Sequence, residues 1–141
     1  MMANMQFQIT DNSDEVLNEL AHNIDNVLEA WGLYGEGQAK RNIIETTRNP
    51  TGRLMNSITH TTDDNTAIIG TNVEYAIWNE IGTGIYASEP GGRQDPWFYQ
   101  DSKGNWHKTS GMKPKHFLQR AITEHIETYK EILEKGLKGQ L

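Results

Sequence analysis

Histidines and carboxylates are the side chains of this sequence that could carry acid–base or metal chemistry, and their spacing argues against both. No two histidines are three or four residues apart, so no pair shares a helical face as local zinc motifs require. Glu89 and Asp95 could approach a histidine only through the fold of a long loop. We therefore expect solvent-exposed histidines and no metal site. The histidines are His22, His60, His107, His116 and His125.

Nucleophilic and phosphate-binding motifs are also missing. The chain contains no cysteine, which excludes thiolate catalysis, disulfides and cysteine-ligated zinc, and no serine lies in a nucleophile-elbow sequence. Gly82-Thr83-Gly84 follows a predicted helix and precedes no Walker lysine, which favours a helix cap and turn over a phosphate-binding loop. We predict a protein that is not an enzyme and uses no cofactor. The alternative from another class is a small hydrolase or nuclease that uses His107, His116 and loop carboxylates.

The net charge of −6 lies entirely in the first thirty residues, which hold six of the nineteen acidic residues and none of the thirteen basic ones. Duplex-binding proteins usually carry a basic surface that neutralises phosphates, so we expect no sequence-specific DNA binding. A single-strand-binding module with aromatic side chains stacked on bases is a third interpretation. No apolar run approaches the roughly 20 residues that span a bilayer, and no secretory signal is visible. We expect a soluble protein in a reducing cytoplasm.

A long amphipathic helix must position most of the chain. Asn12 and Glu15 form a potential capping box, and apolar residues then recur at helical spacing as far as Trp31. Three glycines within residues 32–37 predict a kink or break, because each costs about 1 kcal/mol inside a helix. Helical periodicity resumes at Ala39 and ends before Pro50.

Alternating and turn-flanked segments predict the strands. Residues 5–10 alternate apolar and polar side chains, which indicates a half-buried strand. Two further strands, 57–62 and 66–71, are joined by the turn-forming Asp63-Asp64-Asn65, and a short helix over 74–81 ends at Gly82.

Residues 83–113 form a long segment rich in glycine and aromatic residues. A hairpin is predicted within it, with strands at 97–100 and 106–109. Its aromatic side chains either form a docking surface or fold back to extend the core, and we expect the segment to be mobile in the free monomer and ordered against a neighbour. Pro114 opens the last helix, which ends near Gly136.

The fold predicted from these elements is a single α+β domain over residues 1–141. A small antiparallel sheet packs against the long N-terminal helix and the C-terminal helix, and residues 83–113 form a loop or hairpin insertion.

Three blocks of sequence resemble the gene-product-ten-like family of long-tailed bacteriophages, the tail-completion or head–tail joining proteins. The first block is AKRN at 39–42 with TGRLMNSI at 51–58; the second is IGTNVEYA at 69–76 with EIGTG at 80–84; the third is KHFLQRA at 115–121. The likeness covers roughly residues 15–135. It departs from the family where Pro50 directly precedes Thr51, where Arg120 replaces a frequent proline, and in the length of the 83–113 segment.

The resemblance implies a non-enzymatic virion protein that assembles as a ring, a hexamer, at the head–tail junction and resides in the host cytoplasm during assembly. Its implied partners are copies of itself and the neighbouring neck, connector and tail proteins; DNA passes through without specific binding, and no membrane is involved. A tail terminator of the same junction is the alternative. The candidate motif and interface residues are Thr51, Gly52, Arg53, Leu54, Ser57, Tyr75, Ala76, Glu80, Gly82, Thr83, Trp97, Phe98, Trp106, Phe117 and Leu118.

Roles for some of these residues follow from their chemistry. Thr51-Gly52 can make a tight turn that places Arg53 and Ser57 between helix and sheet. We expect Tyr75 to pack under the short helix and Glu80 to accept hydrogen bonds from the amides of residues 82–84. This unit is either a fold-defining corner or an exposed interface. An acidic first helix lining the channel would let DNA slide rather than bind.

Overall fold

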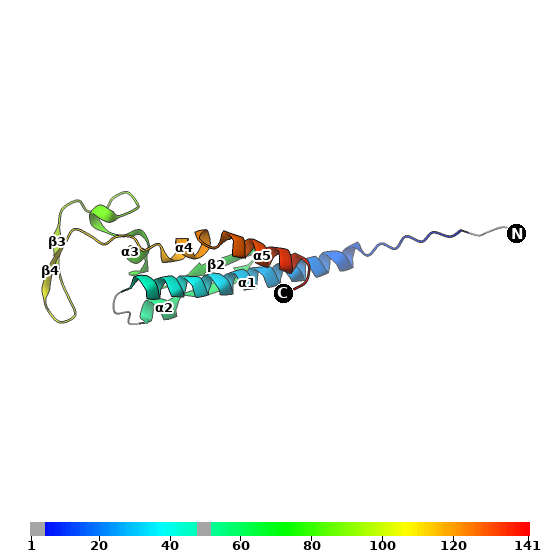
Figure 1. The fold of residues 1–141 in the computed structure, drawn as a ribbon, viewed down its shortest axis with the longest axis horizontal. Helices are drawn as coiled ribbons and strands as arrows, with labels where there is room; N and C mark the ends of the chain where they lie inside the picture. Colours follow the sequence, from blue (N-terminus) through cyan, green and yellow to red (C-terminus); the bar gives the residue numbers. More distant parts are fainter. Residues whose placement is uncertain (1–4, 48–51) are drawn as a thin grey trace.

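One long helix, α1 (Ser13–Thr46), organises the molecule (Figure 1). The computed structural model describes residues 5–47 and 52–141. Helix α1 begins after Asn12, as predicted, but the capping box does not form: the Asn12 side chain makes no cap bond, and the Ser13 N–H donates to the Asp11 carboxylate at 2.9 Å. Asp14 lies in the first turn, where the positive end of the helix dipole favours acidic side chains.

Helix α1 continues through residues 32–37 without the predicted interruption. A Cβ atom on Gly32 would lie 2.4 Å from Cδ2 of His60, and one on Gly35 would lie 2.1 Å from Cδ1 of Ile69. The two glycines therefore allow side chains of the neighbouring strands to pack directly against the helix backbone. This close packing offsets the local cost of glycine in a helix.

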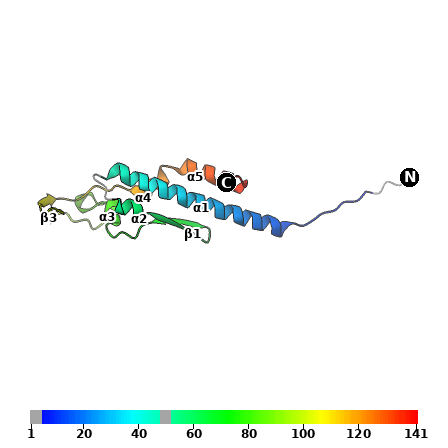
Figure 2. The same ribbon diagram turned by 90° about the horizontal axis from the view of Figure 1, so that it is seen from below.

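The strands β1 (Thr59–Asp63) and β2 (Thr66–Gly70) form an antiparallel hairpin beside α1, in the register Thr59↔Gly70. The turn residues Asp64 and Asn65 have φ angles of 35° and 63°, which suit a two-residue hairpin loop. The predicted hairpin is confirmed, but its first strand begins at Thr59 instead of residue 57, because Ser57 ends the helix α2 (Arg53–Ser57), and it extends one residue further, to Asp63. Figure 2 shows this hairpin along one side of α1 and helix α5 (Ile126–Leu137) along another.

A second hairpin, β3 (Trp97–Gln100) and β4 (Trp106–Thr109), matches the predicted strands residue for residue. It lies at the end of the molecule opposite the N-terminus (Figure 1). The described residues therefore contain two separate two-stranded sheets rather than one. The predicted short helix is α3 (Ala76–Ile81), followed by the 3-10 turn η1 (Gly84–Tyr86).

The C-terminal helix starts later than predicted and is divided in two. Helix α4 (Phe117–Thr123) begins three residues after Pro114, and α5 follows it after a break at Glu124 and His125. Backbone hydrogen bonds from the N–H groups of Lys115 and His116 to α3 hold this part of the chain outside the helix.

Residues 5–10 are extended, but they form no strand, contrary to the prediction. Met5, Phe7 and Ile9 are 80%, 89% and 96% exposed. The segment extends from the N-terminal end of α1 away from the other described elements (Figure 1). No strand of the described residues lies beside it.

The core lies at the end of α1 that approaches α2 (Arg53–Ser57). Its one buried polar side chain among the described residues, Asn42, donates from Nδ2 to the carbonyl oxygen of Phe117 at 3.0 Å. The arrangement confirms the predicted α+β class. Within the described ranges, no helix has the length and apolar character needed to cross a membrane. The core residues are Ala39, Ile43, Leu54, Ile58, Val73, Ala76, Phe117 and Ala121.

Candidate assembly interface

The three sequence blocks meet in the core. Leu54 from the first block, Ala76 from the second and Phe117 from the third belong to the same buried cluster, and Leu118 packs against it. These side chains fix how α2, α3 and α4 sit on α1. In the monomer they act as packing residues, and Leu54, Ala76 and Phe117 are buried.

The turn before α2 depends on Gly52, whose φ of +82° is favourable only for glycine; Thr51 lies outside the described residues. Ser57 Oγ donates to the Leu54 carbonyl oxygen at 2.6 Å and lies 2.6 Å from Oγ1 of Thr71, which ties α2 to the end of β2. Residues of the first block thus anchor the β1–β2 hairpin.

Tyr75 lies at the N-terminal end of α3, and its ring is partly exposed rather than buried beneath the helix. The Arg53 guanidinium carbon lies 5.7 Å from the ring centroid, within cation–π distance. Tyr75 is thus more exposed than predicted, and its ring lies against Arg53 of α2.

Glu80 does not accept hydrogen bonds from residues 82–84. Its Oε2 accepts from the Leu118 N–H and its Oε1 from the Gln119 N–H, each at 2.9 Å. The Gly82 N–H donates to Trp78 instead. The first N–H groups of a helix have no acceptors within the helix. For α4, the carboxylate of Glu80, which lies 38 residues before Leu118 in the sequence, accepts two of these N–H groups.

Gly82, Thr83 and Gly84 form the base of the aromatic hairpin. The Thr83 N–H donates to the Met112 carbonyl oxygen at 2.8 Å, and the Met112 N–H donates to Thr83 Oγ1 at 2.9 Å. A Cβ atom on Gly84 would lie 1.9 Å from the Ser110 carbonyl oxygen. The glycines therefore allow the outgoing and returning chains to cross closely, as a turn rather than a phosphate-binding loop.

The aromatic residues of β3 and β4 do not fold back onto the core. Phe98 is 65% exposed and Trp106 is 68% exposed. Tyr99 stacks on His107 with ring centroids 5.3 Å apart, and His107 Nε2 lies 2.8 Å from Oδ2 of Asp101. The hydrogen bond from His107 lowers the pKa of Asp101. The hairpin is thus stabilised locally while Phe98 and Trp106 face solvent.

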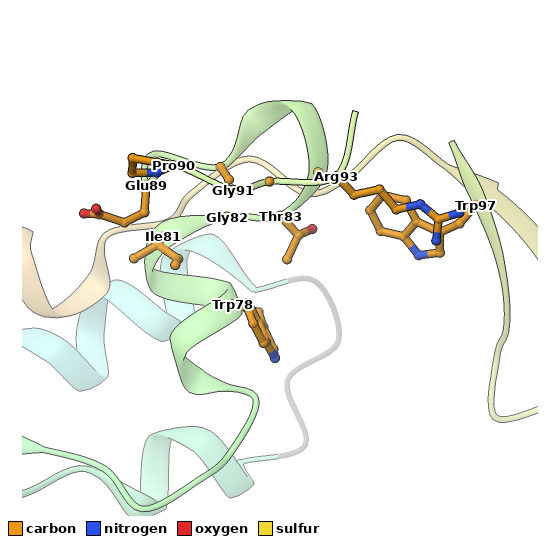
Figure 3. Close-up of a pocket in the computed structure, with 12 residues that line it drawn as sticks. Trp78, Ile81, Gly82, Thr83, Glu89, Pro90, Gly91, Arg93 and Trp97 are labelled. Atoms are coloured by element: carbon orange, nitrogen blue, oxygen red, sulfur yellow. The ribbon is translucent and has the colours of Figure 1, made fainter. Parts of the chain in front are cut away.

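A pocket of about 350 Å³ lies where this hairpin meets α3 (Figure 3). Trp78 and Trp97 stand on two sides of it, and the Arg93 guanidinium lies 5.4 Å from the Trp97 ring. Trp97 was predicted as an interface residue from the sequence, whereas Trp78 was predicted only to lie in the short helix.

A second hollow, which we call the apolar groove, lies between α1, β2 and the two C-terminal helices and has a volume of about 350 Å³. Sequence reasoning assigned the C-terminal stripe to the core because a groove and a core need the same helical spacing. Among the described residues that line the groove, only Lys130 is charged. The groove is lined by Trp31, Ala67, Ile69, Ile122, Ile126, Tyr129, Lys130 and Leu133.

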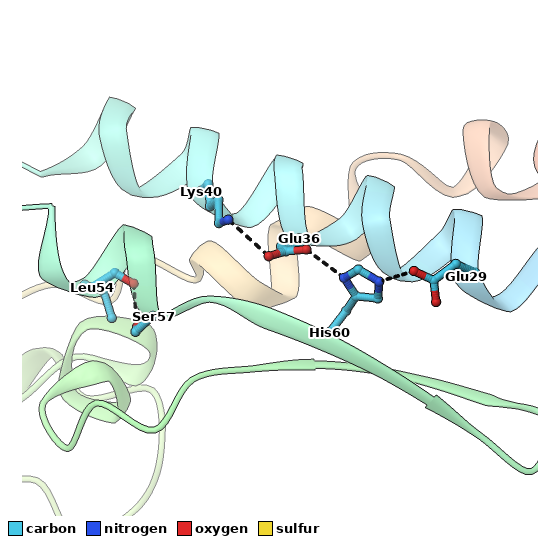
Figure 4. A network of polar contacts seen from close by, with 6 residues as sticks. All are labelled: Glu29, Glu36, Lys40, Leu54, Ser57 and His60. Atoms are coloured by element: carbon cyan, nitrogen blue, oxygen red, sulfur yellow. Dashed lines mark hydrogen bonds and ion pairs between the residues drawn. The ribbon is translucent and has the colours of Figure 1, made fainter.

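His60 contradicts the expectation of exposed histidines. Its side chain is only 14% exposed and lies between two carboxylates of α1 (Figure 4), with Nε2 2.7 Å from Glu29 Oε1 and Nδ1 2.6 Å from Glu36 Oε2. These hydrogen bonds raise the pKa of His60. The hydrogen bonds that Glu36 accepts from His60 and Lys40 lower the pKa of Glu36. Across the described residues, no group of three or more histidine, aspartate or glutamate side chains is arranged to hold a metal ion.

The geometry thus provides exposed apolar surfaces and a hydrogen-bonded, well-packed unit that holds them in place. It brings the three blocks together, and the end of the second block forms the base of the aromatic hairpin. No protein-family model matches the sequence. No curated protein and no solved structure matches it either.

Proposed function

We propose that this chain is a structural protein of the head–tail junction of a tailed bacteriophage, acting through ring assembly and protein docking without catalysis or a cofactor. The proposal starts from the resemblance of the three blocks. It is supported by the way in which Leu54, Ala76 and Phe117, one from each block, pack in one core.

The observation that carries the proposal is the exposure of large apolar side chains at both ends of the molecule. Phe7 and Ile9 are exposed at one end, and Phe98 and Trp106 at the other. Large apolar side chains exposed close together are typical of sites that bind other proteins. An elongated subunit with such surfaces at both ends suits a particle in which each copy contacts several neighbours.

The charge distribution is also consistent with passage of DNA. Acidic side chains of α1, including Asp25 and Glu29, lie near Asp63 and Asp64 of the first hairpin. If this face lined a channel, like-charge repulsion would keep the duplex from adhering.

A nonsense mutation in the gene for this chain tests the proposal in the phage that carries it. We expect DNA-filled heads and complete tails to accumulate separately, and purified protein added to the lysate should restore joining. Tails of uncontrolled length would instead identify a tail terminator. Infectious particles that lack the protein would refute both roles, and turnover of a substrate by the purified chain would support the hydrolase alternative.

A further inference from the structure

The β1–β2 hairpin is anchored to the core at its base and not at its tip, which we define as residues 61–68. Ile58 and Val73, which flank the two strands, belong to the buried cluster, and residues 61–66 are all exposed. The outer part of the hairpin therefore stays beside α1 (Figure 2) through the contacts of the face that it turns toward this helix.

His60 and Ile69 make the closest of these contacts. They are opposite each other in the register of the two strands, so their side chains lie on the same face of the hairpin. His60 packs on Gly32 and Ile69 packs on Gly35. Ala67 lies two residues before Ile69, and both side chains line the apolar groove. The position of the tip thus sets the width of this groove.

His60 needs a proton on both ring nitrogens to make its two polar contacts (Figure 4). Nδ1 lies 2.6 Å from Oε2 of Glu36, and Nε2 lies 2.7 Å from Oε1 of Glu29. A carboxylate only accepts hydrogen bonds, so each nitrogen must donate, and only the charged imidazolium carries two N–H groups. The geometry is therefore that of the protonated ring.

Loss of one proton removes one of the two contacts. Glu36 is held by Lys40 at 3.0 Å and its side chain is 17% exposed, whereas that of Glu29 is 61% exposed. The remaining proton is therefore retained toward Glu36. Nε2 then turns a lone pair toward an oxygen of Glu29, and two acceptors repel each other at hydrogen-bond distance. The contact between His60 and Glu29 is lost.

Glu29 also borders an acidic hollow of about 500 Å³ between α1 and the hairpin tip. Asp25 and Glu29 come from the helix, and Asp63 and Asp64 come from the tip. No Lys or Arg is among the described residues that line it. A charged His60 offsets part of this negative charge, and a neutral His60 leaves carboxylates on the two elements facing each other. The lining residues are His22, Asp25, Asn26, Leu28, Glu29, Thr62, Asp63 and Asp64.

The C-terminal helices do not supply a replacement for this charge. Lys130 lines the apolar groove and lies 3.6 Å from Glu127 on its own helix. The Tyr129 hydroxyl donates to the Ala121 carbonyl oxygen at 2.8 Å. Among the described residues, the polar contacts of the His60 ring are those to α1. The balance of charge at the tip is therefore set by α1 and the hairpin.

We propose that the proton on His60 is a latch that holds the hairpin tip against α1, and that its loss lets the tip move outward and widens the apolar groove. Histidine is the side chain whose charge changes near neutral pH. Repulsion in the acidic hollow drives the outward movement, and the core at the hairpin base stays intact. The latch belongs to the single chain and does not depend on the proposed head–tail role.

A distance between α1 and the tip, measured at two pH values, tests the latch. The chain has no cysteine, so nitroxide labels attach only to the introduced thiols of Asn18→Cys/Thr61→Cys protein, and both positions are exposed. Pulsed electron–electron double resonance should give one short distance at pH 6 and an added longer distance at pH 9. Return to pH 6 should restore the short distance alone. Identical distance distributions at pH 6 and pH 9 would overturn the proposal.

Two variants separate the proton from the repulsion. With His60→Gln, which cannot donate to both carboxylates, the labelled pair should show the longer distance at both pH values. With Asp63→Asn/Asp64→Asn, which removes the charge of the tip, it should keep the short distance at pH 9. A pH response of His60→Gln equal to that of wild type, or unchanged opening of the Asp63→Asn/Asp64→Asn protein, contradicts the latch.

A second pair of labels distinguishes movement of the tip from loss of the fold. Thr123 is exposed on α4, so Asn18→Cys/Thr123→Cys protein reports the position of α4 against α1. Its distance should be the same at pH 6 and pH 9. If this distance lengthens together with that of the tip, the whole fold loosens and the proposal of a local latch is wrong.

Discussion

The carboxylate of Glu80 in α3 accepts the backbone N–H of Leu118 at the start of α4, with 2.9 Å between Oε2 and the nitrogen. The second oxygen accepts from Gln119 at the same distance. One side chain thus joins the second and third sequence blocks. It serves a helix that begins without a side-chain cap of its own.

Replacing Glu80 by Ala should therefore destabilise the fold. Loss of a helix N-terminal acceptor costs about 1–2 kcal/mol, and here two N–H groups lose a charged partner. Glu80→Gln retains one acceptor oxygen and should lose less. Urea unfolding measures both, and Glu74→Ala on the same segment is the control because Glu74 is exposed. If Glu80→Ala and Glu74→Ala unfold at the same urea concentration, the capping role is wrong.

Glycines 32 and 37 should respond in opposite ways to the same substitution. A Cβ atom on Gly32 meets the His60 ring at 2.4 Å, and the hydrogen bonds to Glu29 and Glu36 hold that ring in place. Overpacking of this kind costs about 1–3 kcal/mol, which exceeds the gain of about 1 kcal/mol in helix propensity. We expect Gly32→Ala to lower the free energy of unfolding.

Gly37→Ala is the matched control, because, apart from the neighbouring backbone of α1, no atom of the described residues lies within 4 Å of the added Cβ. It should raise the free energy of unfolding by about 0.4–1 kcal/mol. Chemical denaturation of both variants checks the pair. A stabilised Gly32→Ala protein would mean that His60 moves aside freely.

Local turn chemistry could be predicted from the sequence, whereas packing between distant residues could not. Turn chemistry is local, so Asp64 and Asn65 located the first hairpin correctly, and the strand pattern located β3 and β4. The prediction of a break in α1 was wrong because Gly32 and Gly35 admit His60 and Ile69, which are distant in sequence. Packing against the hairpin, rather than helix propensity, decides the conformation there.

The candidate site was predictable only in part, for a related reason. The three blocks were found as sequence patterns, but such patterns do not show which group a polar side chain will bind. Glu80 accepts hydrogen bonds from the start of α4 and not from the nearby amides of residues 82–84. The exposure of Phe98 and Trp106 depends on the hairpin lying away from the core. The apolar groove was missed because its residues, such as Tyr129, share the spacing of core residues.

The joining of phage heads and tails should require the aromatic side chains of the second hairpin. We expect Trp106→Ser to change the free energy of unfolding by less than about 0.5 kcal/mol, because the side chain is largely exposed. The same variant should fail to restore joining in the complementation assay, whereas Lys103→Ser in the turn should succeed. Restoration by Trp106→Ser at wild-type level would remove the hairpin from the interface.

The contacts of His60 should make stability depend on pH. The pKa of His60 is raised by its hydrogen bonds to Glu29 and Glu36, so the folded chain holds this proton more tightly than the unfolded chain. The contribution is complete below about pH 6.5, the ordinary histidine value, and is lost as the pH rises through the raised pKa. Glu36 acts in the other direction: its pKa is lowered, and its contribution is complete above about pH 4.5 and lost as the pH falls.

Stability from this cluster is therefore greatest between these two values. We expect the thermal midpoint of wild type to exceed that of His60→Gln most in this window, and the difference to shrink as the pH rises toward 9. His22→Gln is the control, since His22 is exposed on the same helix as Glu29. A wild-type excess over His60→Gln that stays constant from pH 5 to 9 would show that His60 stabilises the hairpin by packing against Gly32 and not through its charge.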